Sequence, residues 1–269
     1  MVHDKKLRER GVGRKGVYLL PNLFTTAGLF FGFYAIVQAT KGDFANAALA
    51  IFVAMVMDGL DGRVARWTNT ASDFGKEYDS LVDVISFGLT PALVMYEWSL
   101  SQNGKLGWLS AFLYVAATAL RLARFNTQDS PDKRYFVGLP CPAAAAFAAA
   151  WVWLFDSTNT TGSAVEVMSI VVTMCLGLAM VTNIPYKSFK DWDLKGRVPF
   201  VRLIVPVLVL ILVVSDPPRI LFLGFLIYFL SGPAIWLITR ARGEPITETE
   251  FDSAEDGDTE SDTEWDGLD

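Results

Sequence analysis

The apolar positions of this chain fall into long blocks that short polar stretches separate. A helix needs roughly 20 apolar residues to cross the hydrocarbon core of a bilayer. Eight blocks come near that length: 19–40, 44–62, 80–100, 106–123, 140–156, 164–184, 199–215 and 219–239. The blocks at 80–100 and 199–215 give the weakest signals. The pattern predicts an all-α fold, a polytopic membrane helix bundle of about eight transmembrane helices.

The basic residues give this bundle an orientation. With the N-terminus in the cytoplasm, 20 of the 23 Lys and Arg residues fall in cytoplasmic segments, and only Lys41, Lys105 and Arg219 fall on the opposite side. Membrane proteins retain positive charge on the cytoplasmic side. We therefore expect both termini in the cytoplasm and the protein in a bacterial-type inner membrane.

Composition supports the membrane assignment and divides the chain into three parts. The chain is 52% hydrophobic, with mean hydropathy +0.34. Residues 244–269 carry 12 acidic and no basic residues, whereas the rest carries 23 basic and 17 acidic residues. We predict a basic juxtamembrane arm over 1–18, a transmembrane domain over 19–239 and an acidic disordered tail over 240–269. We expect the chain to have the lipid bilayer as its partner and to bind no nucleic acid.

Histidine and cysteine usage narrows the chemistry. The only histidine is His3, in the polar arm, so the chain cannot build a histidine-based nucleophile dyad or a histidine-ligated zinc site. Cys141 and Cys175 lie in apolar segments without a CxxC pair, which is typical of buried small side chains. Carboxylates, arginines and lysines remain as the reactive groups.

One charged run interrupts the apolar pattern. Residues 58–83, DGLDGRVARWTNTASDFGKEYDSLVD, have the spacing DxxDGxxARx8Gx3Dx3D. Residues three or four apart share one face of a helix, so Asp58 and Asp61 can meet Asp79 and Asp83 across a helix pair. An aspartate within a membrane helix costs about 2.5–3.5 kcal/mol. An ordinary charged loop would not set Asp58 and Asp83 against apolar sequence, so a divalent metal such as Mg²⁺ or Mn²⁺ is the expected compensation.

The residues between the aspartates suit a phosphate ligand. Gly62 and Gly75 remove side chains next to Asp61 and Asp79, so that a ligand could approach the backbone. Arg63 and Arg66 add cations that can hold phosphate oxygens.

At every fixed position this run resembles the motif of the CDP-alcohol phosphatidyltransferases, membrane enzymes that move a phosphoalcohol group from a CDP-linked donor to an alcohol and release CMP. Further segments are similar to the phosphatidylserine synthases of bacteria and archaea. These are LPNLFTTAGLFFGFYA from residue 20, DVISFGLTPA from 83, RLARFN at 121–126, FVGLPCPAAAA at 136–146 and TNIPYKSFKDWDLKGRVPF at 182–200. The resemblance covers roughly residues 15–235.

The resemblance implies a division of labour among the aspartates. Asp58, Asp61 and Asp79 would bind a pair of Mg²⁺ or Mn²⁺ ions with help from Asp83, which would also act as general base. The residues implied for CDP-diacylglycerol binding are Asn22, Thr25, Gly62, Ala65, Arg66 and Gly75. The implied reaction transfers the phosphatidyl group to the hydroxyl of L-serine, on the cytoplasmic side.

Serine also needs a partner for its carboxylate. Arg121 and Arg124, three apart, could supply it, although anchoring their helix at the lipid headgroups explains them equally well. Lys187 and Ser86 are weaker candidates. Other acceptors in the same family stay open, namely glycerol 3-phosphate, inositol phosphate and choline.

Two further alternatives and one packing signal complete the expectations. A membrane transporter or ion channel would also carry acidic residues in its spans, but the aspartate pattern has no second copy that would indicate an internal repeat. A metal-dependent scaffold would need the aspartates only for folding. The alanine-rich run at 143–150 predicts a tight helix-packing face, with a homodimer contact as the second option.

Overall fold

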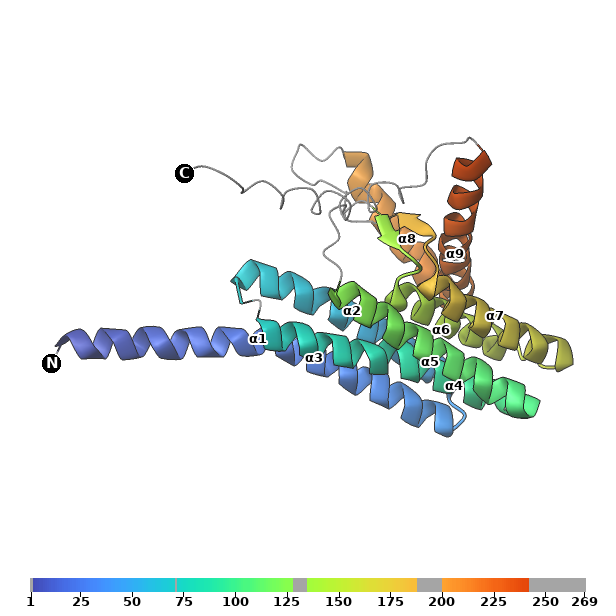
Figure 1. The fold of residues 1–269 in the computed structure, drawn as a ribbon, viewed down its shortest axis with the longest axis horizontal. Coiled ribbons are helices and arrows are strands. Elements are labelled where there is room, and N and C mark those ends of the chain that lie inside the picture. Colours follow the sequence, from blue (N-terminus) through green and yellow to red (C-terminus); the bar gives the residue numbers. More distant parts are fainter. Residues whose placement is uncertain (1, 71, 128–134, 188–199, 242–269) are drawn as a thin grey trace, which may run out of the picture.

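The computed structural model describes residues 2–70, 72–127, 135–187 and 200–241, and these form helices with one small two-stranded sheet (Figure 1). The helices are α1 (Val2–Thr40), α2 (Phe44–Thr68), α3 (Asp73–Asp83), the π-helix η1 (Val84–Leu89), α4 (Thr90–Trp98), the 3-10 turn η2 (Leu100–Asn103), α5 (Gly104–Thr127), α6 (Cys141–Ser157), α7 (Ser163–Val181), α8 (Phe200–Ser215) and α9 (Pro217–Ala241). The strands are β1 (Tyr135–Val137) and β2 (Pro185–Lys187). The predicted acidic tail lies outside the described residues from 242 onward.

The prediction of an all-α membrane bundle is confirmed, whereas the count of eight spans is only partly matched. In the described part of the chain, six helical stretches are long and apolar enough to cross a membrane: Leu20–Thr40, Phe44–Thr68, Asp73–Trp98, Leu100–Thr127, Ser163–Val181 and Pro217–Ala241. Helices α6, with 17 residues, and α8, with 16, fall below the usual spanning length. The basic arm is helical too, because α1 begins at Val2 and extends beyond the bundle (Figure 1).

A short connection brings the two aspartate pairs to the same level. Asn69 ends α2 with a left-handed backbone (φ 51°), and Ser72 caps α3 by accepting a hydrogen bond from the backbone N–H of Gly75 at 3.1 Å. Asp61 lies seven residues before the end of α2, and Asp79 lies six residues after the start of α3. At 1.5 Å rise per residue, both are about 10 Å from the connection. Two helices that reverse direction here therefore place their aspartates side by side.

Helix α6 forms the centre of the bundle. It packs against α2, α4, α7 and α9, and its alanine-rich face from Ala144 to Ala150 is buried. Small side chains let neighbouring helices approach closely. This corrects the sequence-based option of a homodimer contact at 143–150, because helices of the same chain already cover that face.

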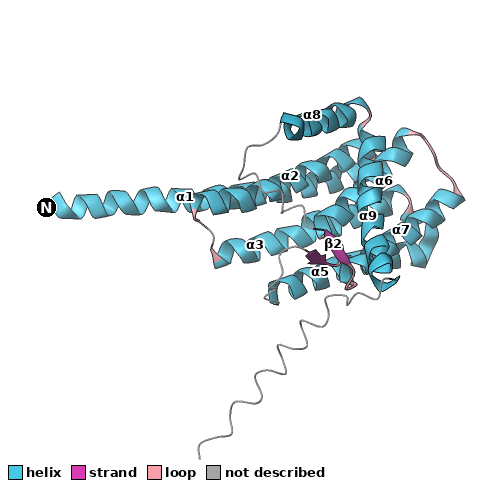
Figure 2. Ribbon diagram, turned by 90° about the horizontal axis from the view of Figure 1, so that it is seen from above, coloured by secondary structure: helices cyan, strands magenta, loops and turns pink. Residues whose placement is uncertain are grey.

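The C-terminal helices and the small sheet close one side of the bundle. Strands β1 and β2 pair antiparallel, with Phe136 opposite Tyr186, and Figure 2 shows the sheet next to α9, which contacts β2. Helix α9 packs on α6 and β2, and α8 contacts mainly α9. In Figure 1, α9 lies across the direction in which α2, α5 and α7 run.

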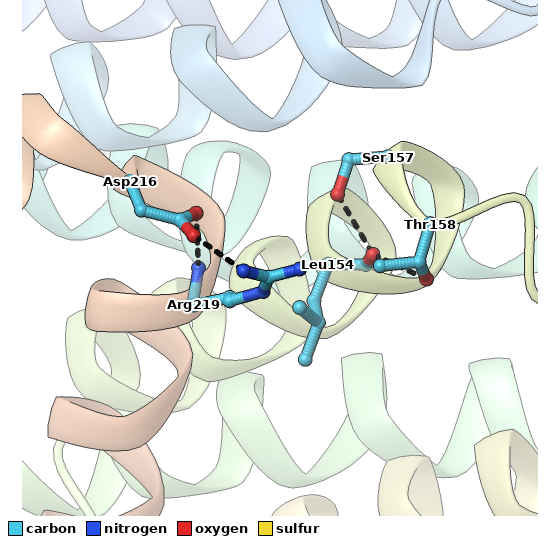
Figure 3. Close-up of polar contacts among 5 residues, drawn as sticks. All are labelled: Leu154, Ser157, Thr158, Asp216 and Arg219. Atoms are coloured by element: carbon cyan, nitrogen blue, oxygen red, sulfur yellow. Dashed lines mark hydrogen bonds and ion pairs between the residues drawn. The ribbon is translucent and has the colours of Figure 1, made fainter.

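Local hydrogen bonds close the C-terminal end of α6 and the start of α9 (Figure 3). The hydroxyls of Ser157 and Thr158 donate to the Leu154 carbonyl at 2.8 and 3.0 Å, which closes the C-terminal turn of α6. Asp216 accepts from the backbone N–H of Arg219 and forms an ion pair with its guanidinium at 3.1 Å, at the start of α9. An exposed pair of this kind contributes little to stability, so its role is to cap the helix.

Candidate functional site

Three of the predicted aspartates meet between α2 and α3. Asp58, Asp61 and Asp79 each offer a carboxylate oxygen, and these oxygens all lie within 4.8 Å of one another. Asp61 is buried, at 6% exposed, and the other two are half-buried. The packing of the two helices thus brings acidic groups 18 to 21 residues apart in sequence to a single point.

Asp83 completes the aspartate cluster, the name used below for Asp58, Asp61, Asp79 and Asp83. Its carboxyl group lies within hydrogen-bonding range of Asp58. All four line one small pocket, whose other walls are Thr25, Gly28, Ala54, Val82, Ser86 and Phe87. No ion pair joins these aspartates to any lysine or arginine of the described residues. The negative charge is therefore left for a ligand to balance.

The aspartate cluster fits a divalent cation by its donor chemistry. Carboxylate oxygens are the hard ligands that Mg²⁺ and Mn²⁺ prefer. Half-buried carboxylates at this spacing repel one another unless a cation lies between them. Asp58, Asp61 and Asp79 would hold such an ion, and Asp83 lies beside them.

Helix α1 supplies the wall of the pocket opposite the aspartates. The hydroxyl of Thr25 donates to a carboxylate oxygen of Asp61 at 2.9 Å, and both residues are buried. Thr25 was predicted to bind CDP-diacylglycerol, but its hydroxyl is directed to a carboxylate of the aspartate cluster. Such a hydrogen bond fixes the orientation of the carboxylate, as residues that hydrogen-bond to metal ligands do.

The same wall carries a pair of glycines. Ser86 donates to the carbonyl of Gly28, and Thr90 donates to the carbonyl of Gly32, both at 3.3 Å. A Cβ added at Gly32 would lie 2.8 Å from the Ser86 hydroxyl oxygen, so only glycine allows this approach. Ser86 therefore lies in the pocket beside the aspartates, and its hydrogen bond to α1 holds it there. A residue that contacts the acceptor serine would need this position.

The other residues predicted to bind CDP-diacylglycerol lie around the pocket and not in its lining. Asn22 of α1 faces Gly75 of α3. A Cβ added at Gly75 would lie 3.4 Å from the Asn22 side-chain oxygen. Gly62 is exposed, and an added Cβ there would meet no atom within 4 Å. Ala65 is half-buried, and Arg66, one helical turn beyond Gly62 on α2, is exposed. The α2 positions thus leave open space next to Asp61.

The remaining predicted serine contacts are Arg121, Arg124 and Lys187, and the two arginines lie outside the pocket lining. Arg121 on α5 directs a guanidinium N–H to the Cys141 sulfur at 3.5 Å, and its Nε has no hydrogen-bond partner among the described residues. The Cys141 thiol lies close enough to interact electrostatically with both Arg121 and Asp83. Arg124 donates to Asn183 at 2.8 Å. Lys187 belongs to β2, but its side chain lies outside the described residues.

Sequence reasoning missed several residues around the pocket. Gly28 and Gly32 form a small-xxx-small pair, which is a known signal for close helix approach and could have indicated this contact. Tyr78 of α3 shares a hydrogen bond with Thr26 of α1 at 2.9 Å. Nothing in the local spacing points to Tyr78, because its partner is 52 residues away.

The fold and the site together define a class of protein: an all-α membrane bundle whose carboxylate cluster, set between apolar helices, suits a divalent cation and a phosphate ligand. Within this class the chain belongs to the CDP-alcohol phosphatidyltransferase family, whose model matches residues 18–181. The match spans the whole aspartate cluster, and the resemblance inferred from the DxxDG run is confirmed.

Several curated relatives share this family. A CDP-diacylglycerol–serine O-phosphatidyltransferase of Helicobacter pylori is 38% identical over 229 residues, covering 84% of this chain and 94% of the relative. An archaetidylserine synthase of Methanothermobacter thermautotrophicus is 31% identical over 188 residues, covering 69% of this chain and 74% of the relative. A CDP-diacylglycerol–serine O-phosphatidyltransferase of Mycobacterium tuberculosis is 43% identical over 141 residues, about half of each chain.

Proposed function

We propose that this chain is a CDP-diacylglycerol–serine O-phosphatidyltransferase, which transfers the phosphatidyl group of CDP-diacylglycerol to the hydroxyl of L-serine and releases CMP. The observation that carries this assignment is the meeting of Asp58, Asp61 and Asp79 within 4.8 Å beside apolar helices, with Asp83 next to them. The printed names of the Helicobacter pylori and archaeal relatives favour serine as the acceptor.

The aspartates divide the chemistry between them. Asp58, Asp61 and Asp79 would hold Mg²⁺ or Mn²⁺, two ions in all, with help from Asp83. Bound there, the ions would neutralise charge on the phosphates of the donor and the leaving group. Asp83 accepts the proton of the serine hydroxyl as its oxygen bonds to phosphorus and the bond to the CMP oxygen breaks.

The pocket walls bind the two substrates. The open backbone at Gly62 and the exposed guanidinium of Arg66 receive the nucleotide and its diphosphate, together with Asn22, Ala65 and Gly75. Thr25 contributes by holding Asp61. Apolar outer faces of the helices, such as Leu23 and Phe30 on α1, allow the acyl chains to remain in the bilayer.

Among the serine candidates, Arg121 is the best supported. Its Nε is buried without a hydrogen-bond partner in the described part of the chain, and both its guanidinium and Asp83 interact with the Cys141 thiol. In this arrangement Arg121 binds the serine carboxylate, and the serine hydroxyl enters the pocket that Asp83 and Ser86 line. Arg124 and Lys187 are secondary candidates for the same carboxylate.

The membrane arrangement belongs to the same proposal. Both termini and the aspartate cluster face the cytoplasm of a bacterial-type inner membrane, with the arm over 1–18, the catalytic domain over 19–239 and the tail from 240. Eight spans require α6 and α8 to cross in addition to the six longer stretches. A homodimer would use the lipid-facing surface of the bundle. Labelling of single introduced cysteines in intact vesicles tests the topology, and the mass of the detergent-solubilised particle tests the dimer.

The reaction is tested with the purified full chain, CDP-diacylglycerol and isotope-labelled serine in mixed micelles containing Mg²⁺ or Mn²⁺. We expect equal amounts of CMP and labelled phosphatidylserine, and loss of both on chelation with EDTA. Parallel reactions with glycerol 3-phosphate, inositol phosphate and choline test the acceptor, and preference for any of them would overturn the assignment of serine. No CMP release with any acceptor would overturn the enzyme assignment itself.

A further inference from the structure

A proline interrupts the helix that carries Asp79 and Asp83. Pro91 has no backbone N–H, so it cannot pair with the carbonyl four residues before it, which belongs to Phe87. The structure widens at this point into the π-helix η1, where the N–H of Thr90 donates to the carbonyl of Ile85, five residues back. Single π-helical turns inside α-helices are frequent at functional sites.

Helix α5 supplies the hydrogen bond that Pro91 cannot. The hydroxyl of Tyr114 donates to the Phe87 carbonyl at 3.2 Å, and Tyr114 and Phe87 are each only 1% exposed. A buried carbonyl left without a donor is unfavourable, so this hydroxyl stabilises the widened turn. Gly88 fits against Thr118, one turn along α5 from Tyr114, where an added Cβ would lie 3.1 Å from the Thr118 side chain.

The widened turn lies directly beside the aspartate cluster. Phe87 lines the pocket and is one helical turn from Asp83. On the other side, Ser86 and Thr90 donate to carbonyls of α1. The rotation of the helix at Asp83 is therefore set by contacts to α1 on one side and to Tyr114 on the other.

We propose that Tyr114 is a positioning residue for Asp83, acting through the Phe87 carbonyl and the π-helix. This inference rests on the proposed function only in so far as Asp83 serves the reaction. Without the Tyr114 hydroxyl, the freed carbonyl loses its donor, the turn relaxes, and the Asp83 carboxylate moves relative to Asp58 and the acceptor.

The chain contains a matched control for this contact. In α9, Pro233 leaves the Phe229 carbonyl without its helical partner, and the hydroxyl of Tyr186 donates to that carbonyl at 3.3 Å. Burial raises the pKa of Tyr186 to about 12, so this hydroxyl stays protonated and remains a donor. Tyr186 and Phe229 are not part of the pocket around the aspartates. Tyr186→Phe thus removes the same kind of hydrogen bond outside the pocket around the aspartates.

The experiment compares Tyr114→Phe and Tyr186→Phe in the full chain. Turnover, KM for CDP-diacylglycerol, KM for serine and the melting temperature are measured for each. We expect Tyr114→Phe to lower kcat about tenfold with KM for CDP-diacylglycerol changed less than about twofold, because geometry of the reacting group is lost while binding is kept. Tyr186→Phe should leave kcat within about twofold of the parent at a comparable fall in melting temperature.

Equal kinetic effects of the two substitutions, or a fall in melting temperature alone for Tyr114→Phe, would overturn the positioning role. Hydrogen exchange of the amides of residues 84–89 gives a readout independent of turnover. It should speed up in Tyr114→Phe and stay unchanged in Tyr186→Phe, and unchanged exchange in both would contradict the inference. If the parent protein releases no CMP, the proposed function fails, and this exchange measurement still decides whether Tyr114 holds the π-helix.

Discussion

Two regions of this bundle are held together by different interactions. Around the aspartate cluster, hydroxyl groups join α1 to its neighbours: Thr25 bonds to Asp61 of α2 at 2.9 Å, and Thr26 bonds to Tyr78 of α3 at 2.9 Å. Between α6 and α9, the contacts are made by aromatic rings. Phe147 stacks on Phe222 and on Phe229 with ring centroids 5.6 Å apart in each case.

The difference separates precise geometry from bulk stability. A hydrogen bond fixes direction but contributes only about 0.5–1.5 kcal/mol net. Aromatic side chains bury large apolar areas and pack in several tolerated orientations. We therefore expect changes near the aspartate cluster to lower turnover with little effect on folding, and changes between α6 and α9 to do the reverse.

The largest expected effect is on turnover. Asp83→Asn keeps the size of the side chain but removes its ability to accept the serine proton, so kcat should fall by about 10³-fold, within the range for loss of a general base. Binding of CDP-diacylglycerol, measured by equilibrium dialysis with a labelled donor, should be nearly unchanged. An equal loss of binding and turnover would mean that Asp83 acts chiefly as a metal ligand.

The converse change removes the central ring of the aromatic region. Phe147→Ala should lower the free energy of unfolding by about 3 kcal/mol, because a buried ring is replaced by a cavity between α6 and α9. Denaturant titration in detergent measures this. At a temperature where the variant is folded, kcat and both KM values should match those of the parent; a tenfold fall in kcat would show that the two regions are not independent.

Much of the helix layout was predictable from the apolar blocks, since a run of some 20 apolar residues has few alternatives in a membrane protein. The ends were less predictable. The block at 44–62 predicted a helix that continues in the structure to Thr68, past the charged residues Arg63 and Arg66. A helix satisfies its own backbone hydrogen bonds, so it can continue past the last apolar residue, and hydropathy does not register that extension.

The aspartates were identifiable because their spacing along two adjacent helices already implies a shared face. The supporting contacts were not. Thr25 and Asp61 are 36 residues apart, and Tyr114 and Phe87 are 27 apart on helices whose mutual rotation no local pattern specifies. Pro91 is visible in the sequence and predicts a helix irregularity, but the hydroxyl that completes it comes from α5. Such partners depend on tertiary packing.

The third prediction concerns the contact behind Asp61. Thr25→Val keeps the shape of the side chain and removes the hydroxyl, so the Asp61 carboxylate loses its orienting donor. We expect affinity for Mn²⁺, measured by electron paramagnetic resonance of the free ion, to fall about tenfold, since partners of metal ligands typically contribute 10–100-fold. Thr25→Ser retains the hydroxyl and should bind within about twofold of the parent. Equal weakening in both variants would indicate that the methyl group, and not the hydroxyl, matters.

The smallest effects come from comparing two buried serines that each form a hydrogen bond between helices, one beside the aspartate cluster and one between α7 and α6. Ser86 donates to the Gly28 carbonyl at 3.3 Å beside the aspartates, and Ser169 accepts from the Trp151 indole N–H at 3.0 Å between α7 and α6. Replacing either serine by alanine removes one oxygen atom and one such bond. Ser169→Ala should lower the free energy of unfolding by about 1 kcal/mol and leave kcat and KM unchanged. Ser86→Ala should lower kcat/KM for serine about fivefold at a similar cost in stability, because the atom it removes lies in the pocket with Asp83. If both variants lost only stability, the division between a region that directs the chemistry and a region that holds the fold would not extend to single hydroxyl groups.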